Sequence, residues 1–386
     1  MARTLKSDKW LLWATLVLLG VSLLMVYSAS NVLAVNEEAS PYRYLMKQAI
    51  FIAIGLVGLV IGMRVDYHVY RKPIFIWGFM ALSVVLLVVV FGFPKINGTR
   101  RWIDLRFTRM QPSELAKLAA IFFTAALLER RMHRINEIRY ALVPVGIATG
   151  LLAGLILRQP DFGTATALTG VVLVMVFAAG LSFKYVGIVT AILVPAAGLV
   201  VSMAKYRADR ITAFWYPDSD PSGINFQLNQ SLIAVGSGGP LGRGFMEGVQ
   251  KLFYLPEPHT DFIYAVIGEE LGLIGTTLIL ALFCVIAIRG VRAAMLAPDR
   301  YGALMATGLT SMIALQAFVN MSVVLGLVPT KGIPLPFVSN GGSSMIVNLT
   351  AMGILLNITQ HLTSVDSAGR VRREAHTTAD PLGVAG

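Results

Sequence analysis

The feature that most limits the fold of this chain is a series of long apolar runs separated by polar segments. Runs of about 17 to 25 residues have the length at which an α-helix crosses roughly 30 Å of hydrocarbon. A soluble protein would show shorter, amphipathic periods instead. We therefore predict an all-α polytopic membrane protein with about ten transmembrane helices. The apolar runs lie near residues 10–34, 46–63, 74–93, 111–128, 141–157, 162–181, 185–204, 262–288, 303–328 and 341–362.

The composition agrees with a membrane protein and argues against several other classes. Of the 386 residues, 56% are hydrophobic and 14% are charged, whereas a soluble domain has about 25% charged residues. The single cysteine, Cys284, allows no intramolecular disulfide and no zinc or redox motif. A net charge of +11 on a soluble protein would suggest a nucleic-acid partner. Here the basic residues lie mostly in short loops, so membrane topology and anionic membrane lipids explain them better, and we expect no nucleic acid.

The distribution of basic residues sets the predicted topology. An even number of spans places both termini on one side, and we take that side as cytoplasmic. The first apolar run is interpreted as a retained helix, because no compelling cleavage site for a signal peptide follows it. The short outer loop at 95–110 is nevertheless basic, which breaks the usual rule. Either the topology is wrong, or these cations are kept for an anionic ligand or bind lipid headgroups without specificity. The loop contains Lys95, Arg100, Arg101, Arg106 and Arg109.

One long outer loop, residues 205–260, separates the seventh and eighth predicted helices. It is too long for a simple connector, and long ordered loops often carry function. We expect residues 1–362 to form one ten-helix transmembrane domain, and 363–386 to form a disordered cytoplasmic tail. Gly58 and Gly62 have the spacing of two small residues at a helix-packing interface.

Ionisable residues in or beside apolar runs are functional candidates, because their burial in a membrane is costly. Glu114 and Lys117 lie three residues apart near the start of the fourth run and can share one helix face. They could form an ion pair that neutralises itself. Alternatively, Lys117 contacts a ligand phosphate and Glu114 positions it. Asp161 follows a predicted turn and could cap the sixth helix or take part in a binding site.

Asp261 and His259 lie at the outer mouth of the eighth run. Asp261 could cap that helix, but a carboxylate beside a basic loop is also a good general base, and His259 is a second candidate. Glu269 and Glu270 lie about two turns deeper, and we expect them to pair with basic residues from elsewhere in the chain.

Residues 329–344 contain three prolines and adjacent glycines, so they cannot form a regular helix. Irregular backbone near membrane depth must be buried in protein or line a cavity. Its free N–H groups could bind an anion at the start of the tenth helix. The candidate ligand contacts in this segment are Lys331, Ser339, Gly341, Gly342 and Ser343.

These segments together resemble the SEDS family of FtsW- and RodA-like proteins, which act in shape, elongation, division and sporulation. The resemblance extends from about Met25 to His361, and three segments favour the division (FtsW) branch: 26–30, 249–252 and 329–332. Three departures from the family pattern are Asn340 in place of Tyr, Arg106 in place of Gly, and 224–226 in place of a Gly-Tyr pattern. The matching segments are 25–30, 101–105, 111–117, 159–163, 256–262 and 332–344.

The resemblance implies a peptidoglycan glycosyltransferase of the cytoplasmic membrane, enriched at the division septum. Its substrates would be lipid II and a lipid-linked glycan strand, and Asp261 matches the family's catalytic aspartate. Arg100, Arg101, Arg109 and Lys117 would stabilise the leaving diphosphate, and Arg207 and Arg210 would hold the second substrate. A divalent cation could assist, although no ligand cluster in the sequence demands one.

The resemblance also implies protein partners. These are a class B penicillin-binding protein, which is a transpeptidase, and other membrane proteins of the divisome or elongasome. Two other functions compete with the enzyme. A lipid II flippase would share the spans and the diphosphate site, but would place that site near the membrane midplane. A scaffold that only recruits a partner would need neither Asp261 nor the basic loop. No nucleotide-binding motif is visible, which argues against an ATP-driven pump.

Overall fold

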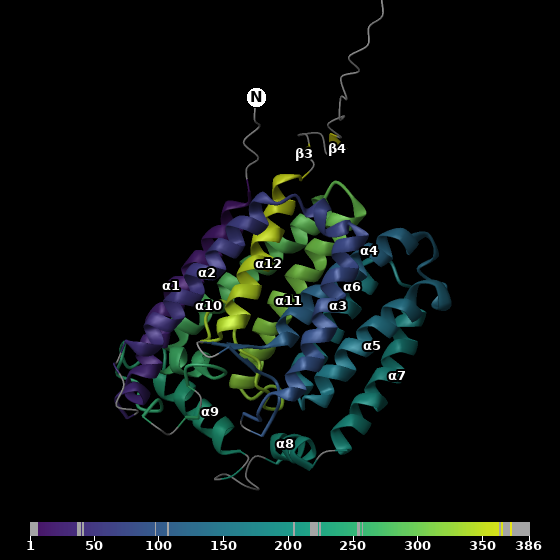
Figure 1. The fold of residues 1–386 in the computed structure, drawn as a ribbon. Helices are drawn as coiled ribbons and strands as arrows, with labels where there is room; N and C mark the ends of the chain where they lie inside the picture. Colours follow the sequence, from purple (N-terminus) through teal and green to yellow (C-terminus); the bar gives the residue numbers. More distant parts are fainter. Residues whose placement is uncertain are drawn as a thin grey trace, which may run out of the picture.

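The computed structural model of this protein is a bundle of long helices (Figure 1). It describes residues 7–36, 40, 42–96, 98–105, 108–203, 205–216, 223, 225–252, 255–256, 258–362, 364–365 and 371–372. Within this part, the backbone but not the side chains is described for 32–36, 193–194, 206–207, 364–365 and 371–372.

Each of the ten predicted apolar runs coincides with a helix, which confirms the predicted fold class. Eight of these helices are long and apolar enough to cross a membrane. Of the other two, α6 is apolar but shorter, and α4 carries charged residues near both of its ends. The ten helices are α1 (Lys9–Asn36), α2 (Arg43–Arg64), α3 (Pro73–Val89), α4 (Pro112–Arg131), α5 (Val143–Arg158), α6 (Phe162–Ala178), α7 (Phe183–Ser202), α10 (Ile263–Leu296), α11 (Arg300–Val324) and α12 (Gly342–Gln360).

Short elements connect these helices. The predicted long outer loop contains two helices, α8 (Lys205–Trp215) and α9 (Phe226–Gly238). A two-stranded hairpin, β1 (Ile103–Asp104) with β2 (Arg109–Met110), lies in the basic outer loop, and β3 (Ser364–Val365) pairs with β4 (Val371–Arg372) after α12. Single turns form η1 (Tyr67–Arg71), η2 (Val90–Gly92) and η3 (Met132–Arg134), and a π-helical turn forms η4 (Ile138–Leu142).

Helix starts follow the local chemistry of the sequence. Proline is the first residue of both α3 and α4, where its missing N–H costs nothing. Aspartate side chains accept hydrogen bonds from free N–H groups at the start of two others. Asp161 caps α6 through Thr164 N, and Asp299 caps α11 through Gly302 N.

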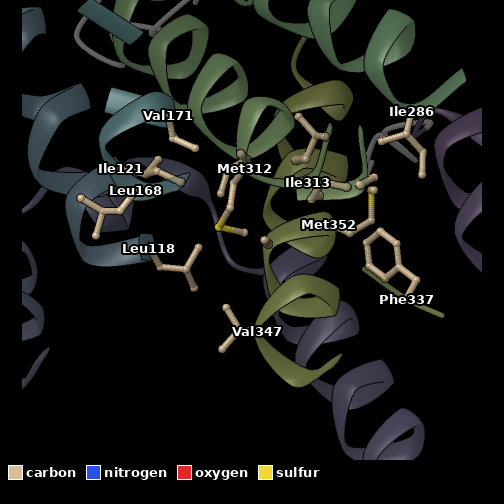
Figure 2. Close-up of a cluster of buried hydrophobic side chains, with 14 of the residues drawn as sticks. Leu118, Ile121, Leu168, Val171, Ile286, Met312, Ile313, Phe337, Val347 and Met352 are labelled. Atoms are coloured by element: carbon tan, nitrogen blue, oxygen red, sulfur yellow. The ribbon is translucent and has the colours of Figure 1, made fainter. Parts of the chain in front are cut away.

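The core lies where α11 and α12 run through the middle of the bundle, with α1 and α2 on one flank and α5 and α7 on the other (Figure 1). Buried side chains of α4, α6, α10, α11 and α12 meet there (Figure 2). The helices α2 and α12 cross closely. A Cβ atom on Gly353 would lie 2.2 Å from Leu59 O, and one on Gly62 would lie 3.0 Å from Ile354 N. The packing role predicted for Gly58 and Gly62 is therefore confirmed, because no larger residue fits this crossing.

The eighth predicted run is interrupted at Gly272, whose φ of 66° and ψ of −159° are not helical. The Tyr264 hydroxyl donates to Thr276 O at 3.2 Å. In a straight helix these residues would be about 18 Å apart along the axis, so the chain turns back on itself. Residues 273–296 alone make about 36 Å of helix, which is enough to cross a membrane. Residues 263–272, which lie before the break, are therefore not needed to cross the membrane and form part of the polar end of the bundle.

The described ends of the chain meet at one end of the bundle. The Asp8 amide donates to Thr359 Oγ1 at 3.1 Å, which agrees with the prediction that both termini lie on the same side. The helices α8 and α9 lie at the opposite end (Figure 1). This opposite end also holds the candidate site.

Candidate functional site

A cavity of about 900 Å³ opens at the end of the bundle that carries α8. Its walls come from the basic outer loop, the starts of α6 and α12, one face of α7 and α8, and the two segments around Asp261 and Lys331. Seven of the fifteen predicted site residues line it, although they come from five separate parts of the sequence. They are Arg101, Asp161, Arg210, Asp261, Lys331, Gly341 and Ser343.

Hydrogen bonds to main-chain oxygens hold the segment that carries Asp261. Its neighbours are held by the loop before α12: Ser339 Oγ donates to Thr260 O at 2.6 Å, and Asn340 N donates to His259 O at 2.9 Å. The Asp261 carboxylate itself lies against Gly332, where an added Cβ would be 2.8 Å from Oδ2. The N-cap of α10 is the next residue, Phe262. Asp261 therefore lies on the cavity wall rather than at the capping position.

Asp161 combines a structural role with a place on the cavity wall. Its carboxylate accepts hydrogen bonds from Thr164 N at 3.1 Å, Thr164 Oγ1 at 2.9 Å and Gln111 Nε2 at 3.1 Å. The Arg101 guanidinium lies 4.0 Å from its Oδ1 and donates to Pro160 O at 2.6 Å. The predicted capping role of Asp161 is thus confirmed. Arg101 and Asp161 together bring one cation and one carboxylate to the cavity.

Two further cations reach the cavity beside Asp261. The Lys331 ammonium lies 4.9 Å from the centre of the Phe162 ring, and burial lowers the pKa of this lysine below its usual value. Arg210 of α8 donates to Thr330 O at 3.4 Å. The start of α12 adds the partial positive charge of a 19-residue helix at Gly341 and Ser343. This wall therefore suits an anionic group.

The buried pair of Glu114 and Lys117 does not line the cavity. The two charged groups are 3.0 Å apart, and Lys117 Nζ also donates to Gln316 Oε1 at 2.9 Å. Both side chains are buried. The geometry is that of an ion pair that neutralises itself, which was one of the two interpretations of the sequence.

Five other predicted residues whose side chains the structure describes also lie off the cavity wall. Arg100 is exposed and donates to Phe91 O, and Arg109 is exposed on β2. The His259 ring packs edge-on against the Tyr44 ring, with 5.2 Å between the two ring centres. Ser339 is buried, and its hydroxyl accepts a hydrogen bond from Leu335 N within the same loop. At Gly342 there is no room for a Cβ beside the Phe51 ring. The side chain of Arg207 lies outside the described residues.

Buried amide side chains behind the cavity wall are among the residues that sequence reasoning missed. Gln316 and Asn320 lie one turn apart on α11, and each donates to a main-chain oxygen of the loop before α12. Gln48 of α2 holds the same loop through Ser339 O. The available signal was an uncharged amide inside an apolar run, which costs free energy unless it is hydrogen-bonded.

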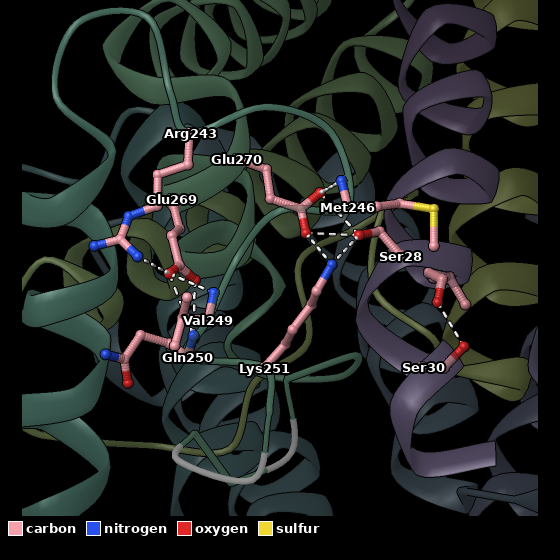
Figure 3. Close-up of polar contacts among 10 residues, drawn as sticks. Ser28, Ser30, Arg243, Met246, Val249, Gln250, Lys251, Glu269 and Glu270 are labelled. Atoms are coloured by element: carbon pink, nitrogen blue, oxygen red, sulfur yellow. Dashed lines mark hydrogen bonds and ion pairs between the residues drawn. The ribbon is translucent and has the colours of Figure 1, made fainter. Parts of the chain in front are cut away.

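A second polar cluster fastens residues 243–251 to α10 (Figure 3). Glu270 accepts from Lys251 Nζ and Ser28 Oγ, each at 2.6 Å to Oε1. Glu269 accepts from Val249 N at 2.8 Å and lies 3.8 Å from the Arg243 guanidinium. The expectation that both glutamates pair with basic residues from elsewhere is confirmed.

The described residues contain no group of three or more His, Cys, Asp or Glu side chains that could hold a metal ion. Among the described residues that line the cavity, the carboxylates are Asp161 and Asp261. A magnesium ion at this site would need oxygen ligands from a bound phosphate as well.

Comparison with known proteins places this architecture in one family. The family model described as the cell cycle protein family FtsW/RodA/SpoVE matches residues 9–364. The chain belongs to the FtsW/RodA/SpoVE family. This result confirms the resemblance drawn from the sequence motifs.

Relatives of this FtsW/RodA/SpoVE protein match over nearly their whole length. It is 41% identical to the "Probable peptidoglycan glycosyltransferase FtsW" of Trichlorobacter lovleyi, covering 95% of this chain and 97% of the relative. It is 43% identical to the "Stage V sporulation protein E" of Bacillus subtilis, covering 92% and 97%.

Solved structures with the same fold support the assignment. A chain from a study of polymerization and crosslinking by a peptidoglycan synthase complex has a TM-score of 0.74 at 28% identity, covering 92% of this chain and 98% of that one. The rod shape determining protein RodA of Thermus thermophilus has a TM-score of 0.69 at 26% identity, covering 94% and 99%.

Proposed function

We propose that this protein is a peptidoglycan glycosyltransferase that polymerises lipid II at the outer face of the cytoplasmic membrane, for septal wall synthesis. The observation that carries the proposal is one cavity in which Asp261 faces the same space as Lys331, Arg210 and Arg101. Such a site offers a base for a sugar hydroxyl and cations for a diphosphate. Several relatives carry the name of this activity.

The reaction needs a proton acceptor and a stabilised leaving group. The Asp261 carboxylate takes the proton from the acceptor 4-hydroxyl of lipid II, and the hydroxyl oxygen attacks the anomeric carbon of the lipid-linked strand. The new glycosidic C–O bond forms as the bond to the diphosphate breaks, and the bonding electrons leave with the diphosphate. In-line displacement inverts the anomeric centre and gives a β-1,4 link. No nucleotide is consumed, because the donor already carries its leaving group.

The leaving diphosphate is stabilised by the cavity cations and by the start of α12. Charge fixed in place before the reaction is usually the largest contribution to catalysis of this kind. Lys331 lies on the loop before α12 and Arg210 lies on α8, both beside Asp261 on the cavity wall. Arg101 lies beside Asp161 on the same wall. The predicted roles of Arg100, Arg109 and Lys117 would require a rearrangement, because these residues do not line the cavity in this structure.

The membrane orientation and the partners are part of the same proposal. With both termini cytoplasmic, the cavity end of the bundle faces outward, where lipid II is polymerised. A class B penicillin-binding protein would cross-link the new strand, and one structural relative comes from a complex that couples polymerization and crosslinking. Other divisome proteins would then recruit the pair to the septum.

The decisive experiment is polymerisation of lipid II by the purified protein together with its penicillin-binding partner. Wild type should yield glycan strands, and Asp261→Asn should yield none at equal expression and equal thermal stability. Glu137→Gln changes an exposed carboxylate paired with Arg134 and serves as the control, with wild-type activity expected. Strand synthesis by Asp261→Asn would refute the assignment. Transport of lipid II across a vesicle bilayer, with no strands from any variant, would establish the flippase instead.

A further inference from the structure

Asn320 holds the main chain of Asp261 directly. It lies on α11 with 1% of its surface exposed. Its side-chain Nδ2 donates to Asp261 O at 2.8 Å and to Ile333 O at 2.8 Å. Both N–H bonds of one amide are therefore used on two carbonyls from different segments of the chain.

These two segments carry the groups that the proposed reaction must hold together. Asp261 lies on the first segment, and Ile333 follows Lys331 and Gly332 on the second. The Asp261 carboxylate also lies against Gly332, with no room for a Cβ between them. A change in the spacing of the two carbonyls would therefore move the base relative to the neighbouring cation.

The amide is anchored in α11. Asn320 lies in a 25-residue helix that is mostly buried along its length. One turn earlier, Gln316 donates to Pro334 O at 3.2 Å and accepts from Lys117 Nζ. Gln316 thus holds the same loop to α11, whereas Asn320 also holds Asp261. The two contacts of Asn320 fix a distance between segments, and Gln316 alone does not.

We propose that Asn320 is a positioning residue for Asp261, an amide that sets the place of the base against the loop bearing Lys331. The proposal rests on the proposed glycosyltransferase function. Asn320 lies outside the cavity lining, so its effect on catalysis acts through Asp261. Since a misplacement of about 1 Å can cost about 10²-fold in rate, loss of this amide should lower the chemical step more than substrate binding.

The test measures kcat and KM for lipid II, together with thermal stability, in the complex with the penicillin-binding partner. Asn320→Ala should lower kcat by about 10- to 100-fold while KM changes by less than about 3-fold. Asn320→Gln keeps both donors on a longer stem and should recover part of the lost kcat. A merely structural role would lower stability without this division between kcat and KM.

The matched control is Asn357→Ala. Asn357 is also a buried amide, donating to Met63 O at 2.9 Å, but it lies near the opposite end of α12 from the cavity. It should lower stability and leave kcat of the folded fraction unchanged. If Asn320→Ala does not fold, Asn320→Ser, which keeps one short donor, should show the same loss of kcat.

The outcomes separate this inference from the proposed function. Wild-type kcat in Asn320→Ala, or a loss matched by Asn357→Ala at equal stability, overturns the role of Asn320. If wild type is active and Asp261→Asn is not, the glycosyltransferase assignment survives that result. If wild type makes no strands, the proposed function fails and the inference fails with it.

Discussion

Lys251 Nζ lies 2.6 Å from Glu270 Oε1, and both side chains are buried. Ser28 of α1 also donates to this carboxylate, so the contact joins α1, α10 and the segment before α10. A buried ion pair of this kind is costly to break, because the remaining charge loses its partner without regaining water.

Lys251→Met should therefore destabilise the protein by about 3 to 5 kcal/mol, since Glu270 would stay buried and uncompensated. The double variant Lys251→Met/Glu270→Gln should recover much of that loss. Thermal unfolding of the purified protein measures both effects. Arg134→Met, which removes one partner of an exposed pair with Glu137, should cost less than about 1 kcal/mol. Equal losses in the two single variants would show that burial does not set the strength of the Lys251 pair.

The ten helices could be predicted because each coincides with an apolar run, and in eight of them the run is long enough to cross a membrane by its hydropathy. The break at Gly272 could not be predicted, since a single glycine inside a predicted helix does not by itself end it. In the structure the backbone at Gly272 lies against Gly239, Leu241 and Gly242, which are distant in the predicted topology. The pairing of Glu114 with Lys117 followed from their spacing, but their distance from the cavity depends on how α4 packs.

The sequence predicted only those parts of the candidate site that lie in segments of unusual composition. Asp261 and Lys331 lie beside prolines and glycines, so the sequence marks their segments as irregular. Asn320 has no such mark, because it lies in a regular helix and its partners are main-chain oxygens. A carbonyl carries no signature of its own in a sequence. Such contacts become visible only when the loop is placed against α11.

The pKa of Lys331 predicts opposite effects of pH on activity and on stability. Burial lowers this pKa below the usual value of 10.5, so the folded protein loses the proton at a lower pH than the unfolded chain does. As pH rises through the lowered pKa, the cavity loses a cation and KM for lipid II should increase. Between the lowered pKa and 10.5, the unfolded chain binds more protons, so folding stability should rise with pH.

Lys331→Arg tests this prediction, because a guanidinium keeps its charge throughout this range. The rise of KM with pH should disappear in this variant, measured as initial rates of strand synthesis at several lipid II concentrations. Lys184→Arg, at an exposed position just inside α7, is the control and should keep the wild-type pH profile. An unchanged rise of KM in Lys331→Arg would assign the pH dependence to another group.

Gly332→Ala should lower activity without lowering stability, because the added methyl group meets only the carboxylate of the proposed base, Asp261. The added Cβ would lie 2.8 Å from Asp261 Oδ2 and 3.8 Å from its Cγ, so the carboxylate must turn away. The backbone at Gly332 is not in the left-handed region, so alanine strains no φ angle. We expect unchanged thermal stability and a fall in strand synthesis of about 10-fold or more. Gly78→Ala, whose Cβ meets nothing within 4 Å on α3, should change neither. Wild-type synthesis by Gly332→Ala would mean that Asp261 does not react from the position it holds in this structure. In that position its carboxylate and the added methyl group would overlap.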